Sequence, residues 1–198
     1  MDIAAVALKE LSRFFPITDS HICHAVRNRP PARFEVIPSF LGKRNGFEEF
    51  PEFVVLDAAH NVDGLRRLIE AVKLKLPSKN LRFMVALADH KDNKKYLDYL
   101  KDFAEHIYLP ESEHFKLLSS SKVAGDLSDM GFSEYSFGED VEETFNTAIK
   151  KTATHDQILI VCGSFYLMGG AREHLGLEEK GDEILTKKAL AILNKAFL

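Results

Sequence analysis

Three short polar segments of this sequence combine residue types that can bind a small molecule. They are DAAHN at residues 57–61, ADHKD at residues 88–92 and GSFY at residues 163–166. Each follows a short apolar run, and each is followed by a segment with helical periodicity. Their carboxylate, imidazole, amide and hydroxyl groups supply hydrogen-bond donors and acceptors of several kinds.

The first segment combines an acceptor, Asp57, with His60 and Asn61 at the start of a predicted helix. A carboxylate can hold a ribose hydroxyl, and an imidazole beside the positive end of a helix suits a phosphate, so the group favours a nucleotide. An equally good interpretation is structural: Asn61 or Asp63 caps the helix and Asp57 hydrogen-bonds the turn. The local residues leave both interpretations open.

The residues of the other two segments can likewise have either a structural role or a ligand-binding role. Gly163 permits close backbone approach, and Ser164 offers a hydroxyl and an N–H at a helix start, where it can equally act as a cap. Tyr166 follows in the same segment and is a candidate to line a site. Asp89 and Lys91 could orient each other at a site, although a solvated turn is the favoured interpretation.

Arg33 follows the PPA segment and opens a predicted strand. Its guanidinium could grip a phosphate with a forked contact, or it could be an exposed charge at the strand end. HICH at residues 21–24 has no second ligand pair at zinc-like spacing, so these are predicted to be ordinary helix residues. The sequence contains no GxxxxGK[ST] loop and no GxGxxG after a predicted strand.

The elements that must position these residues alternate between strands and helices. Strands are predicted over residues 33–40, 53–58, 81–88, 106–109, 134–137 and 157–163, and helices over 63–76, 94–103, 120–130, 141–152 and 164–175. The polar stretch 42–52 is predicted to be a hairpin-like excursion. This alternation predicts an α/β, Rossmann-like three-layer domain with a mostly parallel, six-stranded sheet flanked by helices. In such sheets ligands bind beyond the carboxyl ends of the strands, where all three polar segments fall.

The two ends of the chain are predicted to be helical. Apolar spacing favours helices over residues 3–14 and 18–26, then NRPPA at residues 28–32 marks the best boundary, and residues 181–198 form an amphipathic pattern.

A net charge of -4 and a pI near 6.1 argue against nucleic acid as a partner. No apolar run approaches the roughly 20 residues that span a bilayer, and Asp2 does not suit a signal peptide, so no membrane is expected and the cytoplasm is the predicted location. Cys23 and Cys162 form no disulfide or zinc pattern.

Three motifs, in order, carry a resemblance to a known family. PPARFEVI, VVLDAAHNVDGLRRLIEAV and VCGSFYLMGGAREHLG resemble the PGRFE, LDGAHNP-type and GSLYLVGEVR-type segments of folylpolyglutamate synthase and dihydrofolate synthase, in the Mur ligase superfamily. Residues 85–92 also resemble that family's strand followed by a DKD-type turn. The resemblance implies the last helices of a central ligase domain at residues 1–28 and the C-terminal α/β domain at 29–176. The remaining residues, 177–198, are predicted from their amphipathic pattern to form a C-terminal helix.

The resemblance implies part of an ATP-dependent ligase that activates a carboxylate as an acyl phosphate, which the amino group of L-glutamate then attacks. ATP and Mg²⁺ would be the cofactors, with the Mg²⁺ ligands mainly in the P-loop and central domains, the expected partners of this chain. The second substrate would be a folate or dihydropteroate. Carried over by motif, Arg33 would contact ATP phosphate, Asp57 the ribose or adenosine, and His60 and Asn61 the nucleotide near its phosphates, while Ser164 would be a candidate for glutamate. Apart from these motif residues, Asp89, Lys91 and Tyr166 are candidates to line the site.

The sequence also departs from that family. Ala32 and Ala58 replace two usual glycines, and Val62 replaces a proline. Without a P-loop domain the isolated chain is expected to be inactive, and no metal site is expected within it. Two alternatives remain: the C-terminal domain of a cell-wall Mur ligase, and a free-standing Rossmann-like module that binds a nucleotide or a protein without catalysis.

Overall fold

The computed structural model describes residues 3–22, 30–89 and 92–177, which belong to two compact units, residues 1–33 and 34–198. The first unit contains helix α1 (Ile3–Leu11) and a helical turn over residues 19–22, where the N–H of His21 donates to the Thr18 hydroxyl. The predicted tail helix, Lys91, and Cys23 and His24 of the HICH segment lie outside the described residues. The boundary predicted after residue 28 also falls in an undescribed stretch and stays a prediction.

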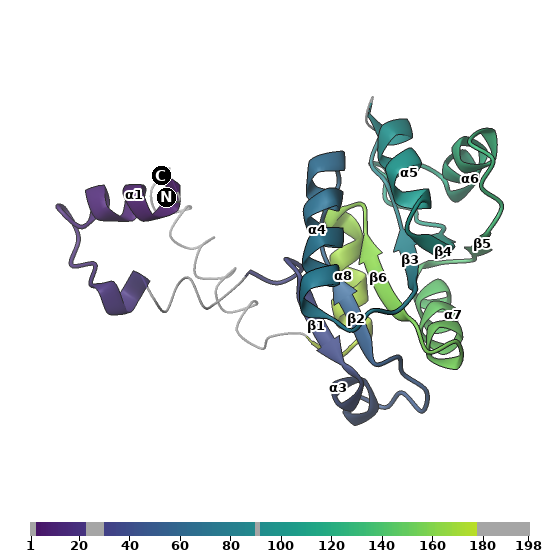
Figure 1. The fold of residues 1–198 in the computed structure, drawn as a ribbon, viewed down its shortest axis with the longest axis horizontal. Coiled ribbons are helices and arrows are strands. Elements are labelled where there is room, and N and C mark those ends of the chain that lie inside the picture. Colours follow the sequence, from purple (N-terminus) through teal and green to yellow (C-terminus); the bar gives the residue numbers. More distant parts are fainter. Residues whose placement is uncertain (1–2, 23–29, 90–91, 178–198) are drawn as a thin grey trace, which may run out of the picture. The chain divides into compact units, whose positions relative to one another are not determined.

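The second unit is built around a six-stranded sheet with the order β1-β2-β6-β3-β4-β5 (Figure 1). The strands are β1 (Glu35–Pro38), β2 (Phe53–Leu56), β3 (Leu81–Val85), β4 (Ala104–Pro110), β5 (Tyr135–Gly138) and β6 (Ile158–Cys162). Only β1 runs antiparallel to its neighbour, and the remaining pairs are parallel. The predicted fold class, a mostly parallel six-stranded sheet flanked by helices, is therefore confirmed.

The central position of β6 aligns the ends of three strands. Val161 lies opposite Leu56 of β2 on one side and opposite Met84 of β3 on the other. All five residues of β6 are buried, as expected for a parallel strand covered on both faces. The segments that follow β2, β3 and β6 consequently leave the sheet at the same edge.

Helices cover both faces of the sheet. They are α3 (Ser39–Arg44), α4 (Val62–Lys75), α5 (Asn93–Lys101), α6 (Ser120–Asp129), α7 (Val141–Thr154) and α8 (Phe165–His174). Helices α4, α5 and α6 enclose one apolar core with alternate residues of β2, β3, β4 and β6. Helices α7 and α8 pack together on the other face. The 3.6-residue spacing in α4 explains this burial, because Leu65, Leu68, Ile69 and Val72 form its buried stripe.

The prediction for residues 33–52 was wrong in part. The first strand ends at Pro38 rather than residue 40, and the helix α3 begins at Ser39, where a hairpin-like excursion was expected to follow. Gly42 in this helix lies directly beneath the ring of Phe50, since a Cβ at Gly42 would come within 2.3 Å of that ring. The buried Phe50 therefore ties the following loop to α3, a contact that local propensity does not reveal.

The backbone explains two of the departures from the family motifs. Ala32 has φ of 56°, a left-handed conformation that favours glycine, whereas Ala58 is not among the described residues with positive φ. Val62 is the first residue of α4, where proline is favoured but not required, because that N–H has no partner within the helix.

Replacing Ala32 with glycine should therefore affect stability differently from replacing Ala58 with glycine. Both alanines are 1% exposed, so either substitution loses a buried methyl group and adds freedom to the unfolded chain. Only Ala32→Gly also relieves a left-handed alanine, which costs roughly 1–2 kcal/mol. We expect the free energy of unfolding, measured with urea, to fall by about 1 kcal/mol more for Ala58→Gly than for Ala32→Gly. Equal losses would contradict the assigned backbone.

Candidate functional site

The three polar segments meet at the carboxyl edge of the parallel strands. A cavity of about 290 Å³ there is lined by residues of all three segments: His60, Ala88, Asp89, Gly163, Ser164, Phe165 and Tyr166. The fold thus brings together His60, Asp89, Ser164 and Tyr166, four of the residues predicted from sequence. Ala88 and Phe165 were not singled out beforehand, since nothing in their residue types points to a site.

At the junction between β2 and α4, Asn61 has the capping role that the sequence left open, whereas Asp57 bonds a residue near the start of β1 rather than the expected turn. Asn61 caps α4 by accepting the N–H of Gly64 on Oδ1 at 2.8 Å, and Asp57 Oδ2 accepts the N–H of Phe34 at 2.7 Å. The Nδ1 of His60 lies 3.0 Å from the Ala58 carbonyl oxygen. When Nδ1 carries the proton, this contact fixes the ring and leaves Nε2 for a ligand, while the Asn61 amide nitrogen remains a donor. Capping and ligand binding are therefore compatible here.

Two backbone hydrogen bonds hold this junction against β6, and in the first the N–H of Asp57 donates to the Val161 carbonyl oxygen at 3.0 Å. The Ala59 oxygen accepts the N–H of Gly163 at 2.9 Å and the hydroxyl of Tyr96 at 3.1 Å. Gly163 has φ of 99°, and a Cβ there would lie 2.6 Å from the Ala86 carbonyl oxygen. Only glycine fits between the three strand ends, which confirms the expected close backbone approach at Gly163.

Tyr96 is a contributor that sequence reasoning missed. It lies on the buried face of α5, 1% exposed, where helical spacing predicts an ordinary core residue. A buried tyrosine hydroxyl needs a partner, which was the available signal, but only the tertiary structure identifies the partners as Ala59 and Cys162. Burial raises the pKa of Tyr96 and raises the pKa of Cys162 to about 12, so both groups beneath the site are neutral near pH 7.

The edge of the cavity formed by α8 is suited to an anion. Ser164 caps α8 by accepting the N–H of Tyr166 at 3.3 Å, and its side chain is buried, leaving the O–H to donate to a ligand. The first residues of α8 line the cavity, so the positive end of the helix dipole faces bound groups. Asp89 supplies the negative charge of the lining.

Arg33, Asp57 and Asn61 are not among the residues that line this cavity. The side chain of Arg33 is exposed, and Lys91 lies outside the described residues. The roles assigned to Arg33, Asp57, His60, Asn61 and Ser164 remain predictions at this point.

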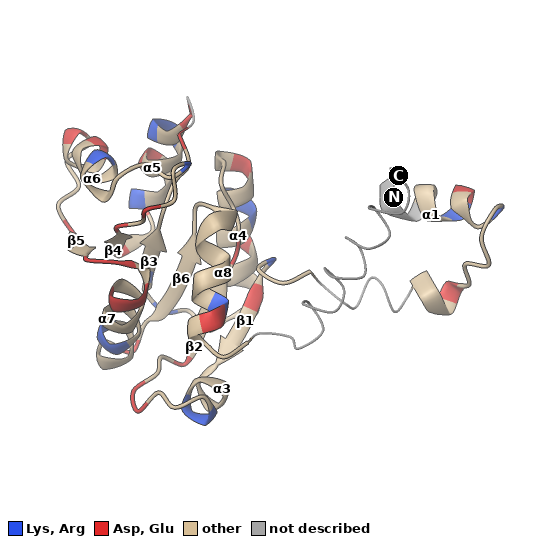
Figure 2. Cartoon of the chain, turned by 180° about the vertical axis from the view of Figure 1, so that it is seen from behind, with Lys and Arg blue, Asp and Glu red and all other residues tan. Residues whose placement is uncertain are grey.

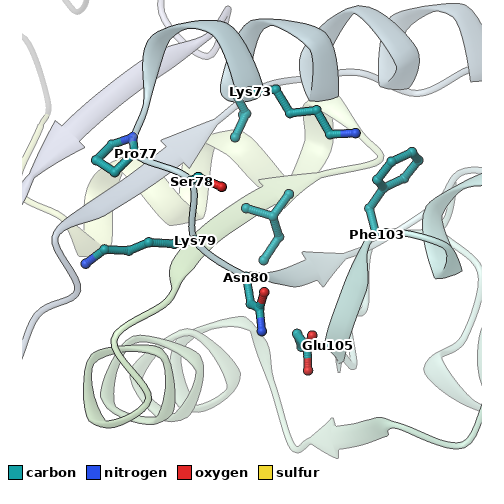
Figure 3. A pocket seen from close by; sticks show the side chains of 9 residues that line it. Lys73, Pro77, Ser78, Lys79, Asn80, Phe103 and Glu105 are labelled. Atoms are coloured by element: carbon teal, nitrogen blue, oxygen red, sulfur yellow. The ribbon is translucent and has the colours of Figure 1, made fainter.

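A second cavity, of about 300 Å³, lies at the opposite edge of the sheet (Figure 3). It is formed where α4 ends and where β3 and β4 begin, and both of its lysines contact other groups of the protein. Lys79 pairs with Glu52 at 2.7 Å and Asp156 at 2.5 Å, and Lys73 lies 4.4 Å from the centre of the Phe103 ring. Figure 3 shows Lys73 extending toward Phe103 and Lys79 extending the other way. The carboxyl edge, with converging helix starts and available donors, is therefore the better candidate site.

Charged residues of both signs occur on the helices that the structure describes (Figure 2). Figure 2 shows Lys and Arg interspersed with Asp and Glu over the helices of the second unit. Among residues 3–22, 30–89 and 92–177, no helix is long and apolar enough to cross a membrane. Within the same ranges, no group of three or more His, Cys, Asp and Glu side chains is placed to hold a metal ion.

Comparison with known proteins identifies the fold. A family model described as Mur ligase, glutamate ligase domain, matches residues 33–165. The chain belongs to this family. No curated protein matches the sequence.

Three solved structures illustrate how this glutamate ligase domain relates to larger enzymes. The bifunctional folylpolyglutamate synthase/dihydrofolate synthase of Yersinia pestis CO92 is 26% identical, with a TM-score of 0.62, over 82% of this chain and 36% of that chain. Folylpolyglutamate synthase of Mycobacterium tuberculosis, complexed with ADP and AMPPCP, is 17% identical, with a TM-score of 0.63, over 77% and 34%. A bifunctional enzyme with Mn, AMPPNP and L-glutamate bound is 23% identical, with a TM-score of 0.64, over 82% and 36%.

The matches confirm the resemblance carried by the sequence motifs. The glutamate ligase domain corresponds to the C-terminal part of these folylpolyglutamate synthase structures. It spans about a third of the length of each. The family is one of ATP-dependent ligases.

The position of Gly163 generates a prediction about stability. Gly163→Ala should lower the free energy of unfolding by at least about 2 kcal/mol, because the new Cβ meets the Ala86 carbonyl oxygen and φ is positive. Gly169→Ala is the matched control, since that helical glycine has open space around it and should gain about 0.5–1 kcal/mol. Urea unfolding measures both, and a neutral Gly163→Ala would contradict the contact with Ala86.

The buried thiol beneath the site generates a second prediction. Because burial raises the pKa of Cys162 to about 12, its thiolate at pH 8 should be roughly 1,000-fold scarcer than in the unfolded chain. In a Cys23→Ser variant, a thiol reagent should react slowly with the native protein and rapidly in denaturant. The contribution of Cys162 to stability is full below about pH 8.5 and is lost as the pH rises toward 12. Equal reaction rates in the two states would show that Cys162 is accessible.

Proposed function

We propose that this glutamate ligase domain binds L-glutamate and part of ATP as the C-terminal portion of a folate or dihydropteroate:L-glutamate ligase. The observation that carries the proposal is one cavity lined by His60 and Ser164, which the family motifs predict, together with Asp89 and Tyr166, which the sequence offers as lining residues. The related structure with AMPPNP and L-glutamate bound supports the same assignment.

The size and chemistry of the cavity favour the amino acid as its occupant. Small-molecule pockets usually range from about 300 to 1,000 Å³, so about 290 Å³ suits a small ligand better than a whole nucleotide. The ammonium group of glutamate can pair with Asp89, and a carboxylate can accept the Ser164 hydroxyl at the positive end of α8.

The nucleotide would lie against the junction between β2 and α4. His60 offers Nε2 and Asn61 its amide nitrogen, beside the N-terminus of a 14-residue helix. Asp57 would accept a ribose or adenosine group, and Arg33 would contact phosphate. These few contacts predict weak affinity in the isolated chain, because a P-loop would supply most of the phosphate contacts.

The reaction follows from the family. The acid substrate attacks the γ-phosphorus of ATP, forming an acyl phosphate and releasing ADP. The ammonium group of glutamate loses a proton, and the resulting amine attacks the acyl carbon, which releases phosphate and a second proton as the amide forms. Mg²⁺, when bound, neutralises phosphate charge, and we place its ligands mainly in the P-loop and central domains. This chain's residues would hold and orient glutamate and one side of the nucleotide. Residues 1–28 would be the end of the central domain.

Ligand titration of the labelled chain tests the nucleotide site. MgATP should perturb the amide resonances of residues 60–64 with millimolar affinity, and His60→Ala should weaken binding by about 5–10-fold. His155→Ala is a matched control, because His155 is also exposed and its Nδ1 lies 2.7 Å from the Lys151 carbonyl oxygen, outside this cavity. Micromolar affinity, or equal loss in both variants, would contradict the proposal.

Joining the chain to P-loop and central domains tests the whole reaction. The assembled enzyme should hydrolyse ATP only when L-glutamate and a folate or dihydropteroate are both present. Selection of a different amino acid would identify a cell-wall Mur ligase, and nucleotide binding without turnover would indicate a binding module.

A further inference from the structure

The loop between β4 and α6, residues 111–119, forms part of the surroundings of the cavity although no motif marks it. The N–H of Leu118 donates to the Leu87 carbonyl at 2.8 Å, and Leu117 forms an antiparallel bridge with Ala88, which lines the cavity. At the start of α6, the N–H of Ser120 donates to Glu111 at 3.2 Å, which closes the base of the loop. The loop is thus held against the end of β3.

Three aromatic rings connect this loop to the cavity wall. His114 stacks on Tyr166 with ring centres 4.1 Å apart, and Phe115 stacks on His114 at 5.2 Å. The Nζ of Lys116 donates to the Tyr166 hydroxyl at 2.9 Å and lies 5.2 Å from the centre of that ring. Since Tyr166 lines the cavity, this contact places the Lys116 ammonium group beside a lining side chain.

The charge of Lys116 is not neutralised within the described part of the protein. No carboxylate of residues 3–22, 30–89 or 92–177 forms an ion pair with it, whereas the neighbouring Lys122 pairs with Asp126 at 2.9 Å. An ammonium group has three donors, and the described contact with Tyr166 uses one of them. Lys116 can therefore receive a carboxylate without breaking a salt bridge.

We propose that Lys116 binds the side-chain carboxylate of the incoming L-glutamate and so selects a dicarboxylic amino acid. This inference rests on the proposed function of the cavity. The amino group and α-carboxylate of glutamate share one carbon, so Asp89 and Ser164, both in the lining, would take these adjacent groups. The distal carboxylate then extends toward Tyr166, which holds Lys116.

Titration of the labelled 198-residue chain with L-glutamate and with L-glutamine tests this role at matched ionic strength. L-Glutamate should perturb the amides of residues 114–117 and 163–166, and L-glutamine, which has the same length but no distal charge, should bind about 5–10-fold more weakly. Lys116→Met should reduce the affinity for L-glutamate to that for L-glutamine. Tyr166→Phe, which keeps the ring but releases the ammonium group, should give an intermediate loss.

Lys73→Met is the matched control, because Lys73 also lies over an aromatic ring, that of Phe103, at the opposite edge of the sheet. It should leave both affinities unchanged. Two results would overturn the role of Lys116 without affecting the proposed function. One is an unchanged affinity for L-glutamate in Lys116→Met, and the other is equal affinity of the parent chain for L-glutamate and L-glutamine. If L-glutamate fails to perturb Ser164 and MgATP fails to perturb His60, the proposed function is overturned with it.

Discussion

The candidate site depends on two hydrogen bonds that share one acceptor, the carbonyl oxygen of Ala59. Their donors are the N–H of Gly163 and the hydroxyl of Tyr96. One joins the segments that follow β2 and β6, and the other joins the same point to α5. Buried backbone oxygens need such partners, so moving any one of the three segments would leave polar groups unsatisfied. The residues that line the cavity are therefore held by the same contacts that complete the sheet edge.

The groups beneath the cavity and those lining it have different electrostatic roles. Tyr96 and Cys162 are fully enclosed and neutral, so they position the backbone without adding charge. The polar groups of the lining come from helix starts and loop side chains above them. Capping by Asn61 and Ser164 does not compete with binding, because each cap uses one lone pair and leaves a donor. A ligand that carries one positive and one negative group therefore matches this lining, because the positive group can pair with Asp89 and the negative group can lie at the N-terminus of α8.

Much of the fold follows from local patterns in the sequence. Short β-rich runs such as FVVL and ILIVC, alternating with helical stripes ended by Pro77 or a capping residue, predict parallel strands and crossover helices. The predicted ends of the strands and helices were less accurate. Helix α3 was missed because the contact of Gly42 with Phe50 depends on packing that no periodicity predicts. The sheet order also required tertiary structure, since β6 inserts between β2 and β3, far from either in sequence.

The sequence by itself determined the class of fold, the family resemblance and four residues that line one cavity, because these depend on residue types and their order along the chain. The four lining residues are His60, Asp89, Ser164 and Tyr166. Residue types alone could not decide whether Asn61 and Ser164 cap a helix, bind a ligand or do both. The tertiary structure decided that Asn61 and Ser164 cap helices, that Tyr96 and Gly163 share the Ala59 carbonyl, and that Lys116 lies beside Tyr166. These facts depend on distances between segments remote in sequence, and such distances are fixed only when the strands pack into one sheet.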